Sequence, residues 1–264
     1  MSLKRLLLLT DYTLASNLAA CHCYQIASLC KAEVISLHGI NSTEDSEWAE
    51  KKSVEQITNI ANFDKNISFK PVVSTLNLIQ GLKDWLKNKS VDLTFMATHG
   101  KKDLQFITGS NALKLIFNAE TPTVVVQHNT PLRPYKNILL PIFSHEAELQ
   151  APLSTLQAII SLFGSKLTII IPATKDDHEE KEMQKKVDTI KNVLKIDNAH
   201  LELRRTDQPT KKFGKELLSV ASHEKFDLIA LMIDTKHHRK EAEKRKKIFQ
   251  ELITNENGIP VLCI

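Results

Sequence analysis

The stretch of the chain most suited to chemistry runs from Met96 to Asn111. It follows the apolar run 91–96, which is typical of a buried strand, and it precedes residues 112–117, whose apolar spacing is helical. Gly100 and Gly109 let the backbone approach a ligand closely, and the serine after Gly109 can cap the helix, whose first N–H groups are free. Parallel α/β proteins build anion sites from a strand, a glycine, a polar loop and Gly-Ser before a helix, so the pattern predicts such a site here.

This loop resembles the nucleotide loop of universal stress proteins, whose pattern is Gly-x-x-Gly, nine residues, and then Gly-Ser or Gly-Thr. The chain departs from that pattern twice. Ala97 stands where the first glycine would be, and eight residues, 101–108, separate Gly100 from Gly109. Two glycines and a serine also occur in ordinary strand-to-helix turns, which is the alternative interpretation of the loop.

The end of the first apolar run carries a second part of the resemblance. Asp11-Tyr12-Thr13 matches the aspartate, aromatic residue and hydroxyl residue that end the family's first strand. The resemblance implies an adenine nucleotide, ATP or a related one, with any Mg²⁺ held by its phosphates. Beside the base it places Thr10, Asp11, His38 and Gly39, and beside the ribose and phosphates it places Ala97, Thr98, His99, Gly100, Gly109, Ser110 and Asn111.

The topology agrees with this placement, because both sets include residues at the carboxyl ends of the first and fourth strands, where the strand order reverses. Two of the residues also have plainer interpretations. Asp11 can cap the helix that follows the first strand. His99 can be a loop histidine without a catalytic role, since no nucleophile or acid partner stands beside it.

The first half of the chain alternates strand-like runs with helical spacing, which predicts a doubly wound α/β domain over residues 1–130. The resemblance implies the strand order 3-2-1-4-5 of adenine nucleotide alpha hydrolase-like folds. On the first helix, Leu14, Leu18, Cys21 and Leu29 fall on one side, as core-facing residues do. The predicted strands are 4–10, 33–38, 67–73, 91–96 and 121–126, and the predicted helices are 14–30, 48–61, 76–87 and the one after Gly109.

The same order of segments then runs again, which predicts a second domain of the same kind over residues 135–264. A short, stiff linker, Pro131-Leu132-Arg133-Pro134, joins the two. We expect a tandem of two five-stranded parallel sheets whose fifth strands pair as an internal pseudo-dimer, and a further homodimer is open. The repeated segments are 135–141 after 3–9, 226–232 after 91–96, and 259–263 after 121–125.

The second half lacks the residues of the candidate site. Its first strand ends in Leu140-Pro141-Ile142-Phe143-Ser144, with no acid, and its fourth ends in Asp234-Thr235-Lys236-His237-His238, with no glycine. Adjacent histidines face different ways on a helix, so a solvated basic helix is favoured over a metal site for His237 and His238. We therefore expect one nucleotide per chain, bound in the first domain.

Composition argues against several classes of protein. The chain has 264 residues, 42% of them hydrophobic and 25% charged, and its net charge of +4 is too small to indicate a nucleic-acid surface. No apolar run reaches the length of a bilayer span and no signal-peptide cleavage site follows the first residues, which favours the cytoplasm. Cys21 and Cys23 lie two residues apart on a helix and cannot share an ion, so we expect reduced thiols and no metal site.

Three functional classes stay open. The favoured one is a non-catalytic nucleotide-binding module of stress physiology whose protein partners are unknown. The second is a degenerate scaffold or dimerisation protein that binds no nucleotide, which Ala97 and the short spacer support. The third is an enzyme of the adenine nucleotide alpha hydrolase superfamily, but the Ser-Gly-Gly and His-x-x-His signatures of such enzymes are absent from the sequence. At most very slow ATP hydrolysis is expected.

Overall fold

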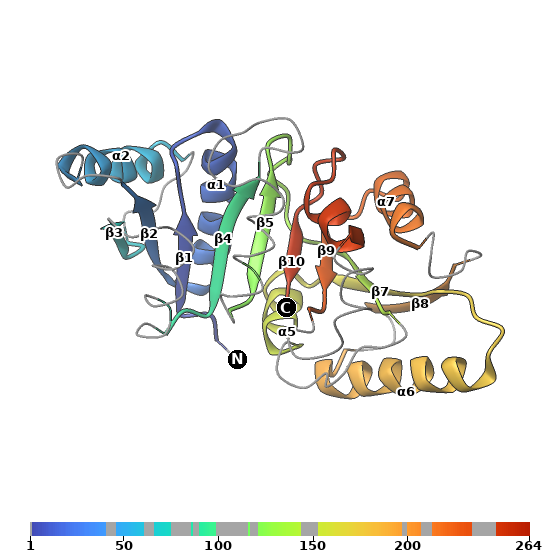
Figure 1. Ribbon diagram of the computed structural model, residues 1–264. Coiled ribbons are helices and arrows are strands. Elements are labelled where there is room, and N and C mark those ends of the chain that lie inside the picture. Colours follow the sequence, from blue (N-terminus) through green and yellow to red (C-terminus); the bar gives the residue numbers. More distant parts are fainter. Residues whose placement is uncertain are drawn as a thin grey trace. The chain divides into compact units, whose positions relative to one another are not determined.

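The structure is a computed structural model in which residues 2–40, 46–60, 66–74, 86, 90–98, 116, 121–143, 153–196, 200–206, 213–233 and 247–264 are described. The chain divides into two compact units, Ser2–Leu132 and Arg133–Ile264 (Figure 1). Each unit has its own parallel sheet and its own hydrophobic core. The predicted His237-His238 pair and nearly all of the predicted helices at 76–87 and after Gly109 lie outside the described residues.

The sheet of the first unit has five parallel strands, β1 (Arg5–Leu9), β2 (Glu33–Gly39), β3 (Phe69–Ser74), β4 (Leu93–Thr98) and β5 (Thr123–Gln127). Their order is β3-β2-β1-β4-β5, so β1 is central and the strand order reverses beside it. After Arg5, β1 is a run of four buried leucines, and every residue of β4 is buried, as in central parallel strands. The described helices of this unit are α1 (Leu14–Cys30) and α2 (Ser46–Thr58).

Helix α1 packs on β1, β4 and β5 through a side that is rich in small residues and does not include Leu14 or Leu29. The predicted span of the helix is confirmed, but the prediction of its core-facing side is wrong: Leu14 is 84% exposed and Leu29 is 50% exposed. Small side chains let a helix lie close to a flat sheet and still fill the space between them. The buried side of α1 carries Ala15, Ser16, Ala19, Ala20, His22, Cys23, Tyr24, Ile26 and Ala27.

The second unit repeats this architecture with β6 (Asn137–Pro141), β7 (Lys166–Ile171), β8 (Leu201–Arg205), β9 (Leu228–Leu231) and β10 (Val261–Cys263). The order β10-β9-β6-β7-β8 gives β6 the central place that β1 has. The predicted fold class, two doubly wound five-stranded sheets of order 3-2-1-4-5, is confirmed. Pairing between the two fifth strands stays a prediction. The described helices are α5 (Leu153–Phe163), α6 (Asp177–Leu194), α7 (Phe213–His223) and the helical residues 247–253.

One hydrogen-bond pattern recurs at the start of both central strands. Oδ2 of Asp92 accepts the backbone N–H groups of residues 4 and 5, at 2.7 and 2.9 Å. Oδ2 of Asp227 accepts those of residues 136 and 137, at 3.1 and 2.9 Å. A carboxylate that accepts two backbone N–H groups makes a strong, directional tie. The sequence repeat around the two aspartates therefore has a structural cause, which is to tie the entry of the fourth strand to that of the first.

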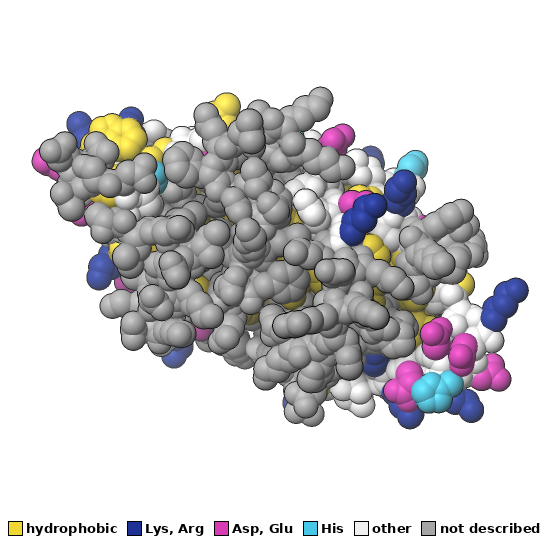
Figure 2. Space-filling model, viewed as in Figure 1, with side chains coloured by type: hydrophobic (Ala, Val, Ile, Leu, Met, Phe, Trp, Pro, Cys, Tyr) yellow, Lys and Arg dark blue, Asp and Glu magenta, His cyan; other side chains and the backbone are white. Residues whose placement is uncertain are grey.

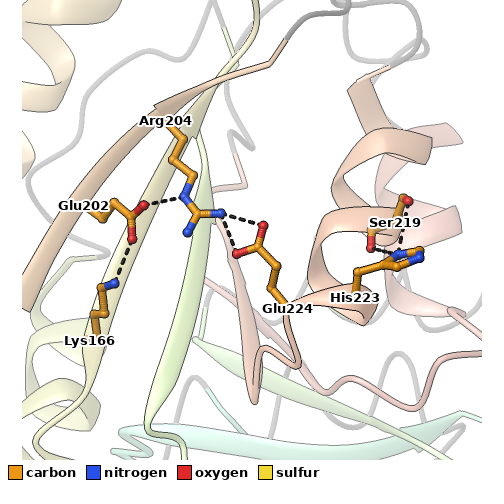
Figure 3. A network of polar contacts seen from close by, with 6 residues as sticks. All are labelled: Lys166, Glu202, Arg204, Ser219, His223 and Glu224. Atoms are coloured by element: carbon orange, nitrogen blue, oxygen red, sulfur yellow. Dashed lines mark hydrogen bonds and ion pairs between the residues drawn. The ribbon is translucent and has the colours of Figure 1, made fainter.

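The outer strand of the second unit, β8, carries charged side chains that pair with their neighbours (Figure 3). Glu202 accepts from Arg204 and from Lys166, the latter at 2.7 Å, and Arg204 also donates to Glu224. Hydrogen bonds from Arg204 and Lys166 lower the pKa of Glu202 to about 2. Charged side chains on an edge strand oppose pairing with another chain. Figure 2 shows further charged side chains over α6, whose first turn is acidic.

Candidate functional site

The carboxyl ends of β1, β2 and β4 bring the described candidate residues to one edge of the first unit. β1 pairs with both other strands, and this is the point where the strand order reverses. The residues at the edge are Thr10 and Asp11 after β1, His38 and Gly39 on β2, and Ala97 and Thr98 on β4. The remaining candidates, His99, Gly100, Gly109, Ser110 and Asn111, lie outside the described residues.

Asp11 holds the residue that caps α1. Its Oδ1 accepts the Thr13 hydroxyl at 2.6 Å and the Thr13 backbone N–H at 3.1 Å. Thr13 is the N-cap, and its side-chain oxygen accepts from the backbone N–H of Ser16. The alternative in which Asp11 itself caps the helix is therefore wrong, because Asp11 acts one step removed, by orienting the cap.

His38 is hydrogen-bonded to the turn that follows β1. Its Nδ1 lies 2.8 Å from the carbonyl oxygen of Thr10. A carbonyl only accepts, so Nδ1 carries the proton in this contact, and Nε2 of the neutral ring is an acceptor. The side chain thus joins the ends of β1 and β2 at the position where the resemblance places the adenine base.

Tyr12 is a prominent residue of this edge to which the sequence analysis assigned no contact. Its ring lies on the His38 ring, with centroids 4.4 Å apart and planes 32° apart, and the edge of Trp48 approaches it at 5.8 Å. Its hydroxyl donates to the carbonyl oxygen of Ala49 at 2.6 Å and lies 2.7 Å from Oγ of Ser53. Burial raises the pKa of Tyr12, so the hydroxyl keeps its proton. The available signal in the sequence was an aromatic residue directly after the motif aspartate.

Helix α2 reaches the same edge through a second polar contact. The Thr10 hydroxyl donates to Oε1 of Gln56 at 2.9 Å, and Nε2 of Gln56 donates to Oδ1 of Asn17 at 2.6 Å. Figure 1 shows α2 running across the carboxyl-terminal side of the sheet. No spacing or motif marks Gln56 in the sequence, because its role depends on how α2 packs beside β2 and β3 in the folded unit.

The end of β4 contributes a buried hydroxyl group. Thr98 is fully buried, and its Oγ1 has no hydrogen-bond partner among the described residues. Ala97 is buried within β4 and pairs in register with Val126 of β5. The alanine that replaces the family's first glycine is therefore part of a regular strand.

The equivalent edge of the second unit is apolar. Thr10 N donates to the Leu37 carbonyl at 3.0 Å, and Ile142 N donates to the Ile170 carbonyl at 2.9 Å, which aligns the two edges. Phe143 then stands at the place of Asp11. The other replacements are Ile142 for Thr10, Ile171 for His38, Pro172 for Gly39, Met232 for Ala97 and Ile233 for Thr98.

Phe143 belongs to the core of the second unit. Its ring packs edge-on against Phe213 of α7 at 5.2 Å and against Phe249 at 5.7 Å, and all three side chains are buried. Edge-to-face packing at these distances is favourable beyond the area it buries. The volume beside the central strand, polar in the first unit, is filled here by aromatic rings.

Comparison with solved structures identifies the fold class of the whole chain. No family model and no curated protein sequence matches it. A universal stress protein from Archaeoglobus fulgidus DSM 4304 matches with a TM-score of 0.67 at 13% identity, over 100% of this chain and 98% of that one. A candidate universal stress protein from Pseudomonas aeruginosa UCBPP-PA14 matches with a TM-score of 0.66 at 13% identity, over 100% and 93%.

The same fold also occurs in another setting. The cytoplasmic domain of a prokaryotic cation chloride cotransporter matches with a TM-score of 0.59 at 8% identity, over 100% of this chain and 95% of that one. Likeness at such identities shows the fold alone, and one fold hosts several functions. The chain has the fold of universal stress proteins in tandem form, as its motifs predict.

Proposed function

We propose that this chain is a universal stress protein-like module of the stress response that binds ATP or a related adenine nucleotide in its first unit and catalyses no reaction. One contrast carries this proposal. The edge at which open parallel sheets bind ligands holds Thr10, Asp11, His38 and Thr98 in the first unit, and only apolar side chains at the same positions in the second. A fold needs no polar groups there, as the second unit demonstrates.

The Thr98 hydroxyl supports a polar ligand at this edge. Among the described residues the buried Thr98 hydroxyl has no hydrogen-bond partner, and a ribose or phosphate oxygen beside it would supply one. The glycine loop that begins at His99 would supply backbone N–H groups to the phosphates, as the sequence predicts. We infer that Mg²⁺ is held by the phosphates, since no group of three or more His, Cys, Asp or Glu side chains in the described residues could hold a metal ion.

The contacts of the edge support a binding role over a catalytic one. Oδ1 of Asp11 already accepts two hydrogen bonds from Thr13, and Nδ1 of His38 is held by the Thr10 carbonyl. A general base must be within reach of the proton that it takes, and both residues lie where the resemblance places the adenine base and not where it places the phosphates. Phosphoryl transfer also needs a metal ion and charge-stabilising donors around the reacting group. Turnover of ATP by this chain is therefore expected to stay below about one per second, the low end of ordinary enzymes.

We place the protein in the cytoplasm, with protein partners still to be identified and homodimerisation possible. No helix in the described parts of the chain has the length and apolar character needed to cross a membrane. The charges on β8 and α6 belong to alternating or paired sets and do not form a basic surface for nucleic acid.

Calorimetry with ATP and Mg²⁺ tests the proposal. We expect about one nucleotide per chain, and Gly109→Val should abolish the heat of binding without unfolding the protein, because a Cβ there blocks the approach of phosphate. A stoichiometry of two would contradict the assignment to the first unit. Binding that is undetectable at millimolar ATP, in a folded protein, would overturn nucleotide binding.

A scaffold that binds no nucleotide is the second candidate, and one observation favours it. The rings of Tyr12 and His38 stack on each other on the base side, so the ring faces that contact each other are not open to an adenine base. An enzyme of the adenine nucleotide alpha hydrolase type is a weaker candidate, because the Ser-Gly-Gly and His-x-x-His signatures of such enzymes are absent from the sequence.

A further inference from the structure

The backbone of Tyr12 is held in an unfavourable conformation. Its φ is 62°, in the left-handed region that glycine adopts easily and a bulky side chain does not. Strain of this kind persists only where surrounding contacts impose it, and it concentrates at sites of function. The contacts that hold it here are the hydrogen bond from the Tyr12 backbone N–H to the Thr10 hydroxyl, the His38 ring and the two polar groups of α2.

Helix α2 is attached to the edge mainly by polar contacts. Its buried residues are Ala49, Ser53 and Ile57, so it contributes one large apolar side chain to the core. By contrast, α6 of the second unit buries Met183, Val187, Ile190 and Leu194. An element with few buried apolar groups opens at a lower free energy than the rest of a unit.

Several of the polar attachments of α2 come from the candidate site itself. Tyr12 reaches Ala49 and Ser53, and Thr10 reaches Gln56. Trp48, on the first turn of α2, is 53% exposed and touches the same Tyr12 ring, and Figure 2 shows apolar surface over this helix. A ligand that displaces the Tyr12 ring therefore also removes two of the hydrogen bonds that hold α2 in place.

We propose that Tyr12 is a gate on the base side of the site: its ring must leave the face of His38 before an adenine base can lie against the end of β2, and its departure loosens α2. This inference rests on the proposed function, because the nucleotide base is the group that competes with the ring. Ligand binding and α2 docking then oppose each other, and each weakens the other by the same factor. The apparent affinity is the intrinsic affinity reduced by the fraction of molecules with the gate open.

Nucleotide affinity measured for matched variants tests the gate. Tyr12→Phe keeps the ring and removes the hydroxyl, so we expect ATP to bind roughly threefold to tenfold more tightly, the net effect of one or two hydrogen bonds. Tyr12→Ala removes the ring as well, and we expect a gain of at least about tenfold. Tyr24→Phe, a buried tyrosine of α1 outside the edge, is the control and should bind as the wild type does.

The outcomes separate the gate from the proposed function. Equal affinity of the wild type and both Tyr12 variants overturns the gate and leaves nucleotide binding intact. Weaker binding by Tyr12→Ala also overturns it, because the ring is then a wall of the site. Absence of binding by every protein overturns both, whereas binding by Tyr12→Ala alone supports both.

Amide hydrogen exchange tests the link to α2 without relying on affinity. We expect the amides of residues 46–58 to exchange faster in Tyr12→Phe than in the wild type, and faster in the wild type when ATP is bound. The amides of α6 should not change in either comparison. Slower exchange of α2 on ATP binding would overturn the gate, since the helix would then close on the ligand.

Discussion

The two carboxyl-terminal edges of this protein share a fold and differ in chemistry. At the start of both central strands, two backbone N–H groups donate to an aspartate that precedes the fourth strand, Asp92 in the first unit and Asp227 in the second. At their other ends, Asp11 in one unit is replaced by the buried ring of Phe143 in the other. Contacts that the fold requires recur in both units, and contacts that occur in one unit point to a separate role for that unit.

The difference also has an energetic side. The second unit extends its apolar core to the edge of the sheet, where Phe143, Phe213 and Phe249 pack together. The first unit uses this region for hydrogen bonds among Asp11, Thr13 and their neighbours, whose net contribution to stability is smaller. Substitutions at equivalent positions should therefore have unequal effects on stability.

The largest expected effect is that of Phe143→Ala. Removing a buried aromatic ring from a packed cluster should lower the free energy of unfolding by about 3–5 kcal/mol. Asp11→Ala, at the equivalent place, should lower it by about 1 kcal/mol, since it removes two contacts with Thr13 and no core volume. Urea denaturation of the two variants checks this. Similar losses of unfolding free energy in both variants would contradict the inferred difference in packing between the two edges.

His22 makes the first unit sensitive to acid. Burial in α1 lowers the pKa of His22 from 6.5 to about 4, so the folded state takes up the proton less readily than the unfolded state. Stability contributed by neutral His22 is full above pH 6.5 and is lost as the pH falls toward 4. The linkage amounts to about 2 kcal/mol between pH 7 and pH 5.

The matched measurement for this prediction is urea denaturation of the wild type and His22→Leu at both pH values. The variant should lack this part of the pH dependence. The described residues of α5 in the second unit include no histidine, so the protection of the α5 amides, measured relative to their intrinsic exchange rate at each pH, should change little over the same range. An unchanged pH profile in His22→Leu would refute the assignment.

Asp92→Ala and Asp227→Ala should be equally damaging. Each removes a carboxylate that accepts two backbone N–H groups at partly exposed sites, so we expect a loss of about 1–2 kcal/mol in either case. Thermal and urea denaturation give the two values. A difference above about 1 kcal/mol would show that the shared contacts do not carry equal weight in the two units.

The smallest effect expected is that of Thr13→Ala, which removes the N-cap of α1. A lost cap costs about 1 kcal/mol. Because Asp11 acts by holding Thr13, the double variant Asp11→Ala with Thr13→Ala should cost little more than either single change, and a double-mutant cycle measures this. Full additivity would show that Asp11 stabilises the unit by some other contact.

Much of the fold could be predicted from the sequence. Continuous apolar runs such as residues 6–9 mark central parallel strands, and the recurrence of Asp92 as Asp227 within matching segments marks the tandem repeat. The buried side of α1 could not be predicted in this way. Leucine spacing favoured the side with Leu14 and Leu29, whereas the sheet selects the side whose alanines allow a close approach.

The sequence by itself determined the strand order by resemblance, the loss of polar groups in the second half and the position of Asp11 after a central strand. These features depend on residues near one another in the chain or on repetition along it. Only the tertiary structure decided that Thr13 is the cap, that Tyr12 lies on His38, and that Gln56 reaches Thr10. The last two contacts join residues far apart in the chain, which meet only when β1, β2 and α2 come together, and no local pattern in the sequence encodes that arrangement.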